Sequence, residues 1–101
     1  MSNLTFTKQV EPLGAPGLAR QLTASSTSAN TALSAGVFRI SIRAVGADIR
    51  FSVGPNAQTA TATSHFIANG ERLDFAVRNN ANIAVIRNAT TDGTLEVTEL
   101  I

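Results

Sequence analysis

Apolar and polar residues alternate most regularly in residues 37–53. A two-residue period places successive side chains on opposite faces of a strand. Two such runs are separated by a turn at residues 45–47, which predicts an antiparallel hairpin with one apolar face and one arginine-bearing face. The apolar positions of the two runs, which we expect to fill the core, are Phe38, Ile40, Ile42, Ile49, Phe51 and Val53.

The remaining chain repeats this pattern in shorter runs. Residues 19–24 predict a first strand, residues 31–33 a strand end, and residues 64–67 a short strand before the turn pair Asn69-Gly70. Residues 71–77 predict a strand with Leu73, Phe75 and Val77 directed inward. Residues 82–87 are almost continuously apolar, as in a central strand, and residues 94–100 alternate again with Leu95 and Val97 inward.

Turn residues separate these runs. Gly54-Pro55-Asn56 is a strong turn sequence, and Asn69-Gly70 is a favoured pair for a tight hairpin turn. Residues 57–63 are small and polar, so they predict a loop that crosses the fold or a poorly packed edge. Seven or eight short strands at this spacing, without an amphipathic helix, predict an all-β fold: a single antiparallel β-sandwich of jelly-roll or immunoglobulin-like connectivity.

The N-terminal segment differs from the rest and divides the chain into an arm, residues 1–19, and a sandwich domain, residues 20–101. Proline and glycine in residues 12–17 interrupt regular structure. Leu4, Phe6 and Val10 are unusual apolar residues for a free tail, which favours an extended arm that adds a strand to a neighbouring subunit. A disordered tail is the alternative.

Charge adds one candidate surface. The 101 residues carry a formal net charge of +1, and no basic run indicates nucleic-acid binding. Arg39, Arg43 and Arg50 occupy the polar face of the predicted hairpin and are candidate partner-binding residues. A solvated sheet face is the more common role for such positions.

The sequence offers little catalytic chemistry. His65 is the one histidine, and no nucleophile and base at a recognisable spacing accompany it. There is no cysteine, calcium loop or glycine-rich phosphate loop, so we expect neither an enzyme nor a bound metal or cofactor. Residues 1–3 do not begin a secretory signal, and no apolar run approaches the ~20 residues that span a bilayer. We therefore expect a chain made in the cytosol and no membrane partner.

A pattern of turns and strands covering residues 20–101 resembles small proteins encoded among the virion genes of tailed bacteriophages and prophages. The segments that carry the resemblance are SANTALSAGVFRI (28–40), IRFSVGPN (49–56), ATATSHFI (60–67), ANGE (68–71), IAVI (83–86) and DGTLEVTE (92–99).

The resemblance implies a small β-sandwich virion component that is assembled in the bacterial cytoplasm. Its expected role is that of a capsid decoration, or cement, protein that binds the assembled shell through the major capsid protein or other virion proteins. It also implies a homo-oligomer, for which a trimer at capsid three-fold positions fits the symmetry. The alternative is a tail- or fibre-associated module that binds a host-surface glycan or receptor.

Overall fold

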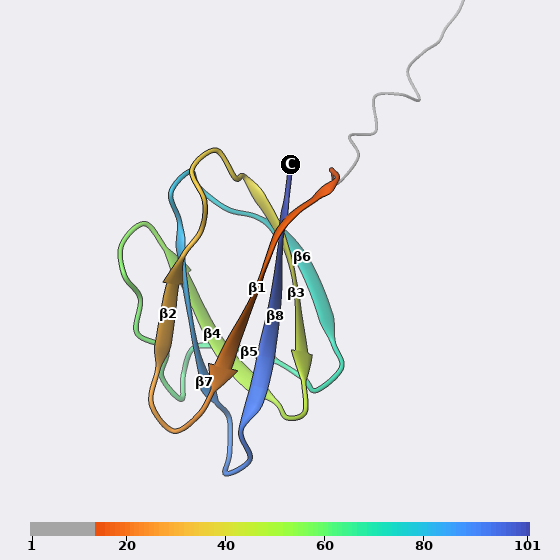
Figure 1. Ribbon diagram of the computed structural model, residues 1–101. Coiled ribbons are helices and arrows are strands. Elements are labelled where there is room, and N and C mark those ends of the chain that lie inside the picture. Colours follow the sequence, from red (N-terminus) through yellow and green to blue (C-terminus); the bar gives the residue numbers. More distant parts are fainter. Residues whose placement is uncertain (1–13) are drawn as a thin grey trace, which may run out of the picture.

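The computed structural model describes residues 14–101, and this part of the chain is all-β, with eight strands and no helix (Figure 1). Short strands separated by turns agree with the two-residue period of the sequence. Their bounds are β1 (Pro16–Ala24), β2 (Ala29–Ala32), β3 (Arg39–Val45), β4 (Ile49–Gly54), β5 (His65–Ile67), β6 (Arg72–Ala76), β7 (Asn82–Arg87) and β8 (Gly93–Leu100).

The strands form two four-stranded sheets in the described part. The first sheet has the order β1-β8-β3-β6 and the second has the order β2-β7-β4-β5. Every paired neighbour is antiparallel. The predicted all-β architecture of antiparallel sheets is therefore confirmed, and the two sheets face each other in a sandwich-like arrangement.

The inward faces of both sheets share one hydrophobic core. From the first sheet, Ile40 and Ile42 of β3 and Leu95 of β8 are essentially fully buried, as the alternation predicts. From the second sheet, Ile49 and Val85 are likewise buried. Burial of each large aliphatic side chain contributes about 1.5–3 kcal/mol before the entropy cost of ordering it. The core therefore holds the two sheets together.

Two further predictions about the core are confirmed. Leu73 and Phe75 of β6, and Val77 just after it, are partly buried and pack against the core cluster. The apolar run at 82–87 is β7, which lies between β2 and β4 in the interior of its sheet.

The predicted hairpin of residues 37–53 is wrong. β3 pairs with β6 and β8 in the first sheet, whereas β4 pairs with β5 and β7 in the second. The turn between them, where Gly46 has φ 92°, therefore crosses from one sheet to the other. Two consecutive strands with apolar faces can pair edge to edge or face each other across a core, and both arrangements require the same alternation.

The Asn69-Gly70 turn is a second connection between the sheets. It joins β5 of the second sheet to β6 of the first, so the predicted hairpin is wrong here too. Gly70 has φ 85°, and its N–H donates to the Ala44 carbonyl at 2.7 Å. The Asn69 side chain accepts a hydrogen bond from the Gly46 N–H at 2.9 Å. The two crossing turns therefore support each other at one end of the sandwich.

Phe38 is not a core residue. It precedes β3 and is 56% exposed, and the preceding Val37 is buried instead. Because Arg39 pairs with Leu100, Phe38 lies opposite Ile101, which is 73% exposed. The alternating pattern of the sequence thus extends to Phe38, which lies beyond the end of the core.

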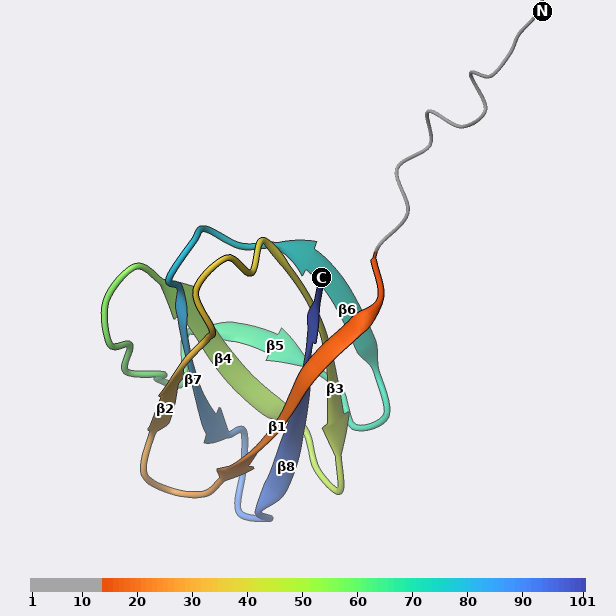
Figure 2. The same ribbon diagram turned by 45° about the horizontal axis from the view of Figure 1, so that its top comes forward.

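The first strand begins inside the segment predicted as the arm. β1 starts at Pro16, and a bulge between Pro16 and Ala19 accommodates the proline and glycine. Ala15 and Ile101 exchange backbone hydrogen bonds of 2.9 and 2.8 Å. Figure 2 shows the start of β1 beside the C-terminal end of β8. Residues 15–19 are therefore part of the first sheet.

Residues 55–64 form a loop that covers the outer face of the second sheet, in agreement with the predicted crossing loop. The Gln58 N–H donates to Asn30 of β2 at 2.9 Å, and its side-chain oxygen accepts from Ser52 of β4 at 2.8 Å. The Ala60 N–H donates to the Ser28 hydroxyl at 2.8 Å. Ala84 of the intervening strand β7 alternates with the core residues but is still fully buried. Gln58 of the loop bonds to Asn30 and Ser52, the two residues that pair with Ala84 on either side, so the loop lies over this part of β7.

Candidate binding groove

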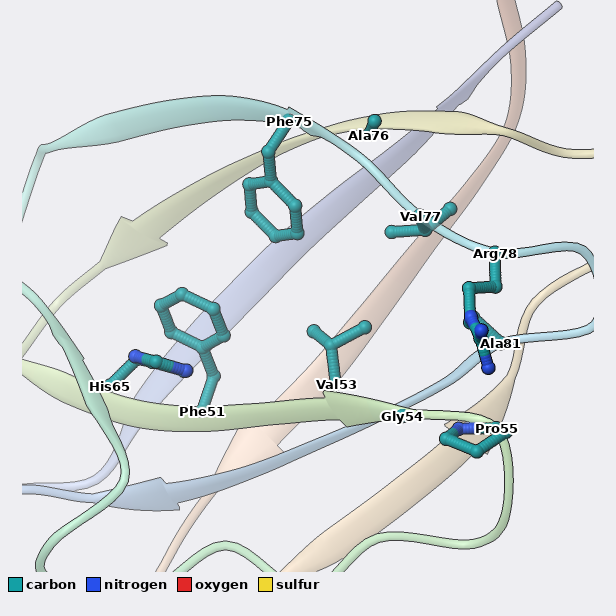
Figure 3. A pocket seen from close by; sticks show the side chains of 10 residues that line it. All are labelled: Phe51, Val53, Gly54, Pro55, His65, Phe75, Ala76, Val77, Arg78 and Ala81. Carbon is teal, nitrogen blue, oxygen red and sulfur yellow. The ribbon is translucent and has the colours of Figure 1, made fainter.

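An apolar groove of about 700 Å³ lies between the two sheets on their open side (Figure 3). Phe51 and Val53 of β4 form one wall. Phe75 of β6 and Val77, the residue after β6, form the other. Concave, mostly apolar sites of this size are the usual binding sites of proteins.

The groove is open because β5 is short. Its three residues pair with Ile49, Arg50 and Phe51 of β4. Among the described strands, none pairs with the second half of β4 on that side as it continues to Gly54. On the other wall, β6 is the last strand of the first sheet. The groove therefore runs between two strand edges whose backbone groups are available for pairing.

The two aromatic side chains of the groove come from opposite sheets. Phe51 and Phe75 stack with ring centroids 5.9 Å apart and an interplanar angle of 16°. His65, on the exposed edge strand β5, lies 5.4 Å from the Phe51 ring at 41°. Figure 3 shows the two phenyl rings facing each other across the groove. This pair joins the walls at one point, and beyond it the groove is lined by smaller aliphatic groups.

A histidine and an arginine lie at the two ends of the groove. His65 lies beside Phe51 at one end, and Arg78 lies beside Val77 at the other (Figure 3). Within residues 14–101, no group of three or more histidine or acidic side chains is arranged to hold a metal ion. The groove therefore presents an apolar surface with the Arg78 side chain at one end.

The three arginines predicted as a partner-binding face do not lie together. Arg39 and Arg43 belong to β3 of the first sheet, whereas Arg50 belongs to β4 of the second. They were expected on one face because the two strands were expected to pair. The other predicted partner-binding residues, Leu4, Phe6 and Val10, lie outside the described residues.

Arg50 is held by its own surroundings. Its guanidinium donates to the Asn88 side chain at 2.9 Å and to the Ser64 carbonyl at 3.1 Å. It also lies 4.9 Å from the centre of the Phe66 ring, within the range of a cation–π contact. These contacts join β4 to β5 and to the loop after β7, so Arg50 has a structural role in the second sheet.

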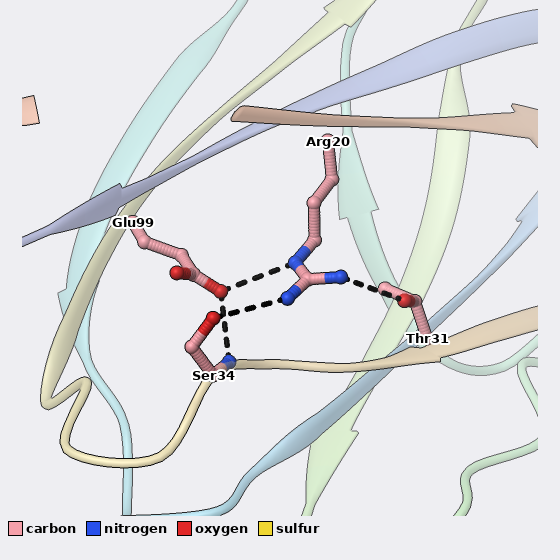
Figure 4. A network of polar contacts seen from close by, with 4 residues as sticks. All are labelled: Arg20, Thr31, Ser34 and Glu99. Carbon is pink, nitrogen blue, oxygen red and sulfur yellow. Dashed lines mark hydrogen bonds and ion pairs between the residues drawn. The ribbon is translucent and has the colours of Figure 1, made fainter. Parts of the chain in front are cut away.

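A polar network at the other side of the core was not predicted (Figure 4). Arg20 of β1 and Glu99 of β8 form an ion pair of 3.1 Å, and the Glu99 side chain is 3% exposed. Arg20 also donates to Thr31 and Ser34, which belong to β2 and the residues after it. The network therefore bridges the two sheets.

The electrostatics of Glu99 follow from these contacts. Burial alone raises the pKa of its carboxyl, but hydrogen bonds from Ser34 and the nearby Arg20 charge outweigh burial, so that the pKa lies below its ordinary value. The strongest of these is the Ser34 N–H, which donates to the carboxylate at 2.8 Å. The sequence did carry a signal, because Glu99 is in phase with Leu95 and Val97, and Arg20 is in phase with Leu22.

Comparisons with known proteins assign no family to this chain. No family model, no curated protein and no solved structure matches it. In the described part of the chain, no helix is long and apolar enough to span a membrane.

Proposed function

We propose that this protein is a structural component of a tailed-phage virion that decorates and stabilises the assembled capsid. The observation that carries the proposal is the strand order, β1-β8-β3-β6 facing β2-β7-β4-β5. We infer jelly-roll rather than immunoglobulin-like connectivity from it, because each sheet interleaves strands from the two halves of the chain. Eight-stranded jelly rolls are common in viral capsid and lectin domains.

The groove and its edges also support a binding role. A decoration protein needs surfaces that pair with or pack on its neighbours. Here the β6 edge, the free half of β4 and the apolar groove between them lie on one side of the molecule. Strand addition at such an edge provides affinity through backbone hydrogen bonds, and side-chain pockets provide specificity.

A decoration protein acts by mass action. If it binds the assembled shell and not the dissociated subunits, it stabilises the shell by RT ln(1 + [L]/Kd), about 2.7 kcal/mol at a hundredfold excess over Kd. The proposed partner is the major capsid protein or a neighbouring virion protein. A homotrimer at a three-fold position of the shell matches the local symmetry of its binding site.

The alternative is a glycan- or receptor-binding module. Its candidate residues, Arg39, Arg43 and Arg50, do not form one face, because they lie on two sheets. Jelly rolls occur in lectin domains as well as in capsid proteins, so the strand order is compatible with both roles. We propose the decoration role because the strand edges and the apolar groove suit packing against protein neighbours.

The test is co-sedimentation of the purified protein with capsid shells made from the genome that encodes it. We expect the protein to sediment with assembled shells, to leave dissociated capsid subunits unbound, and to raise the temperature at which the shells fall apart. Absence of binding to shells, or equal binding to shells and free subunits, would overturn the proposal.

A further inference from the structure

We propose that Asn69 is a latent modification site, at which the side chain is converted to aspartate or isoaspartate only when the two crossing turns at this end of the sandwich separate. This inference does not depend on the proposed virion role. It rests on the Asn69-Gly70 pair and on the hydrogen bonds that hold both residues in the fold.

The reaction is the attack of a backbone nitrogen on the preceding asparagine side chain. The Gly70 nitrogen gives its proton to hydroxide and forms a bond to the side-chain carbonyl carbon of Asn69. The amide nitrogen leaves as ammonia, and a cyclic succinimide remains. Water then adds to one of the two ring carbonyls, and ring opening gives aspartate or isoaspartate. Glycine favours the attack because it has no Cβ to obstruct it, and Asn69-Gly70 is the one Asn-Gly pair in the sequence.

The pair is accessible to solvent. Asn69 and Gly70 are both exposed and form the middle of the turn between β5 and β6. The Glu71 N–H closes this turn by donating to the Ala68 carbonyl at 2.8 Å. Hydroxide and water therefore reach the turn, and the rate depends on whether the two reacting groups can approach each other.

The attacking nitrogen is held by a hydrogen bond to the first sheet. The Gly70 N–H donates to the carbonyl of Ala44 on β3 at 2.7 Å. The proton that hydroxide must remove lies between these two atoms. This hydrogen bond must therefore break before the Gly70 nitrogen can react.

The group under attack is held by the other crossing turn. The Asn69 Oδ1 accepts the Gly46 N–H at 2.9 Å, and the Asn69 N–H donates to the Asp48 carboxylate at 2.8 Å. Rotation of the Asn69 side chain toward the Gly70 nitrogen breaks the first bond, and a shift of its backbone breaks the second. The fold therefore keeps both reacting groups in place as long as the two turns stay together.

The conversion therefore reports the separation of the two turns. Local opening exposes such groups at a lower free energy than global unfolding. When opening and closing are fast, the rate follows the population of the open form. Each of the three hydrogen bonds contributes a factor of about five, so the folded chain should react roughly a hundredfold more slowly than the unfolded chain.

The product does not return to the original turn. Isoaspartate adds a methylene group to the main chain, which displaces Gly70 from Ala44. Aspartate instead places a second carboxylate beside Asp48, whose own carboxylate already accepts the Asn69 N–H. Each modified chain is therefore a permanent record that this end of the sandwich has opened.

The test compares the full-length protein in its folded and unfolded states. Both samples are kept in the same mildly alkaline buffer, one of them with guanidinium chloride. Peptide mapping by mass spectrometry then measures the replacement of the Asn69 amide by a carboxyl group. Conversion should be roughly a hundredfold slower in the folded protein. Equal rates in the two samples would overturn the proposal.

A substitution in the facing turn tests what holds the site. Asp48→Ala removes one of the three hydrogen bonds and leaves the Asn69-Gly70 pair intact. Conversion should become about fivefold faster in the folded chain and stay unchanged in guanidinium chloride. The matched control is Asp74→Ala, an exposed acidic residue on β6, which should behave as the parent does.

Circular dichroism establishes that both variants are folded. An Asp48→Ala variant that reacts no faster than the parent, or an Asp74→Ala variant that is equally accelerated, would refute the assigned role of the facing turn. The comparison of the parent in the two solvents needs no variant, so it decides the proposal even if Asp48→Ala does not fold.

Discussion

Arg20 and Glu99 form an ion pair inside the fold, with 3.1 Å between Nε and Oε2. Arg20 lies on β1, the edge strand of the first sheet, and Glu99 lies on its neighbour β8. The Arg20 guanidinium also donates hydrogen bonds to Thr31 of β2 and to Ser34, which follows β2, so this side chain connects the two sheets. The described residues contain no buried side-chain polar atom without a hydrogen-bond partner, and this network is part of the reason.

Removal of the cation should be costly. Arg20→Met leaves the Glu99 carboxylate buried without its counter-charge, and breaking a buried ion pair costs about 3–5 kcal/mol. We expect about 3 kcal/mol in the free energy of unfolding from urea denaturation, since Arg20 is 24% exposed. Arg43→Met, at an exposed outward position, is the control and should stay within about 0.5 kcal/mol. Equal losses in the two variants would contradict the account.

The same pair predicts a pH dependence. The pKa of Glu99 is lower in the folded than in the unfolded chain, so the unfolded chain binds the proton first as the pH falls. The stabilisation is present above the ordinary glutamate pKa and is lost as the pH drops through the folded value. In Glu99→Gln this part of the acid destabilisation should disappear. Urea unfolding from about pH 6 down to about pH 3 compares the slopes, and identical slopes would show that Glu99 does not contribute.

Two phenylalanines test the limits of the core. Phe51 is 5% exposed and contacts Phe75 across the groove, so Phe51→Ala should cost about 3–5 kcal/mol. Phe38→Ala is the same chemical change at a side chain that is 56% exposed, and it should cost less than about 1 kcal/mol. Thermal or urea unfolding measures both. If Phe38→Ala were the more damaging change, the assignment of the core boundary would be wrong.

The turn at Gly70 should tolerate asparagine better than alanine. An added Cβ meets no atom within 4 Å, so the cost comes from the left-handed backbone at φ 85°. Gly70→Ala should lose about 1–2 kcal/mol, whereas Gly70→Asn should lose less because asparagine visits this conformation. Unfolding free energies of the two variants decide this. An alanine variant as stable as the parent would rule out backbone strain at the turn.

The strands could be predicted from the sequence, but their partners could not. The period of two in β3, β4, β6 and β8 determines which side chains face inward, and this holds for Ile40, Phe51 and Leu95. The same period is compatible with a hairpin and with two strands facing across a core. The difference depends on the turn at Gly46 and on long-range pairing with β6, β7 and β8, which no local pattern encodes.

Most of the candidate groove could not be predicted from the sequence, for the same reason. The groove exists because β5 begins opposite Phe51, which leaves the rest of β4 uncovered, and because β6 lies at the edge of the other sheet. The extent of β5 and the position of β6 both depend on how the strands pair. Phe51 and Phe75 were predicted as core residues, and they are also walls of the groove. Arg50 was predicted on the outer face, but its contacts with Phe66 and Asn88 depend on strands that pair with β4 only in three dimensions.

The central claim, that the protein decorates an assembled capsid, is tested most directly by locating it in an imaged particle. An electron cryo-microscopy reconstruction of virions from the genome that encodes it should contain a small sandwich-like domain bound to the outer surface of the shell at symmetry-related positions. A particle that lacks such density on the shell, or that carries the domain only on the tail, would contradict the claim.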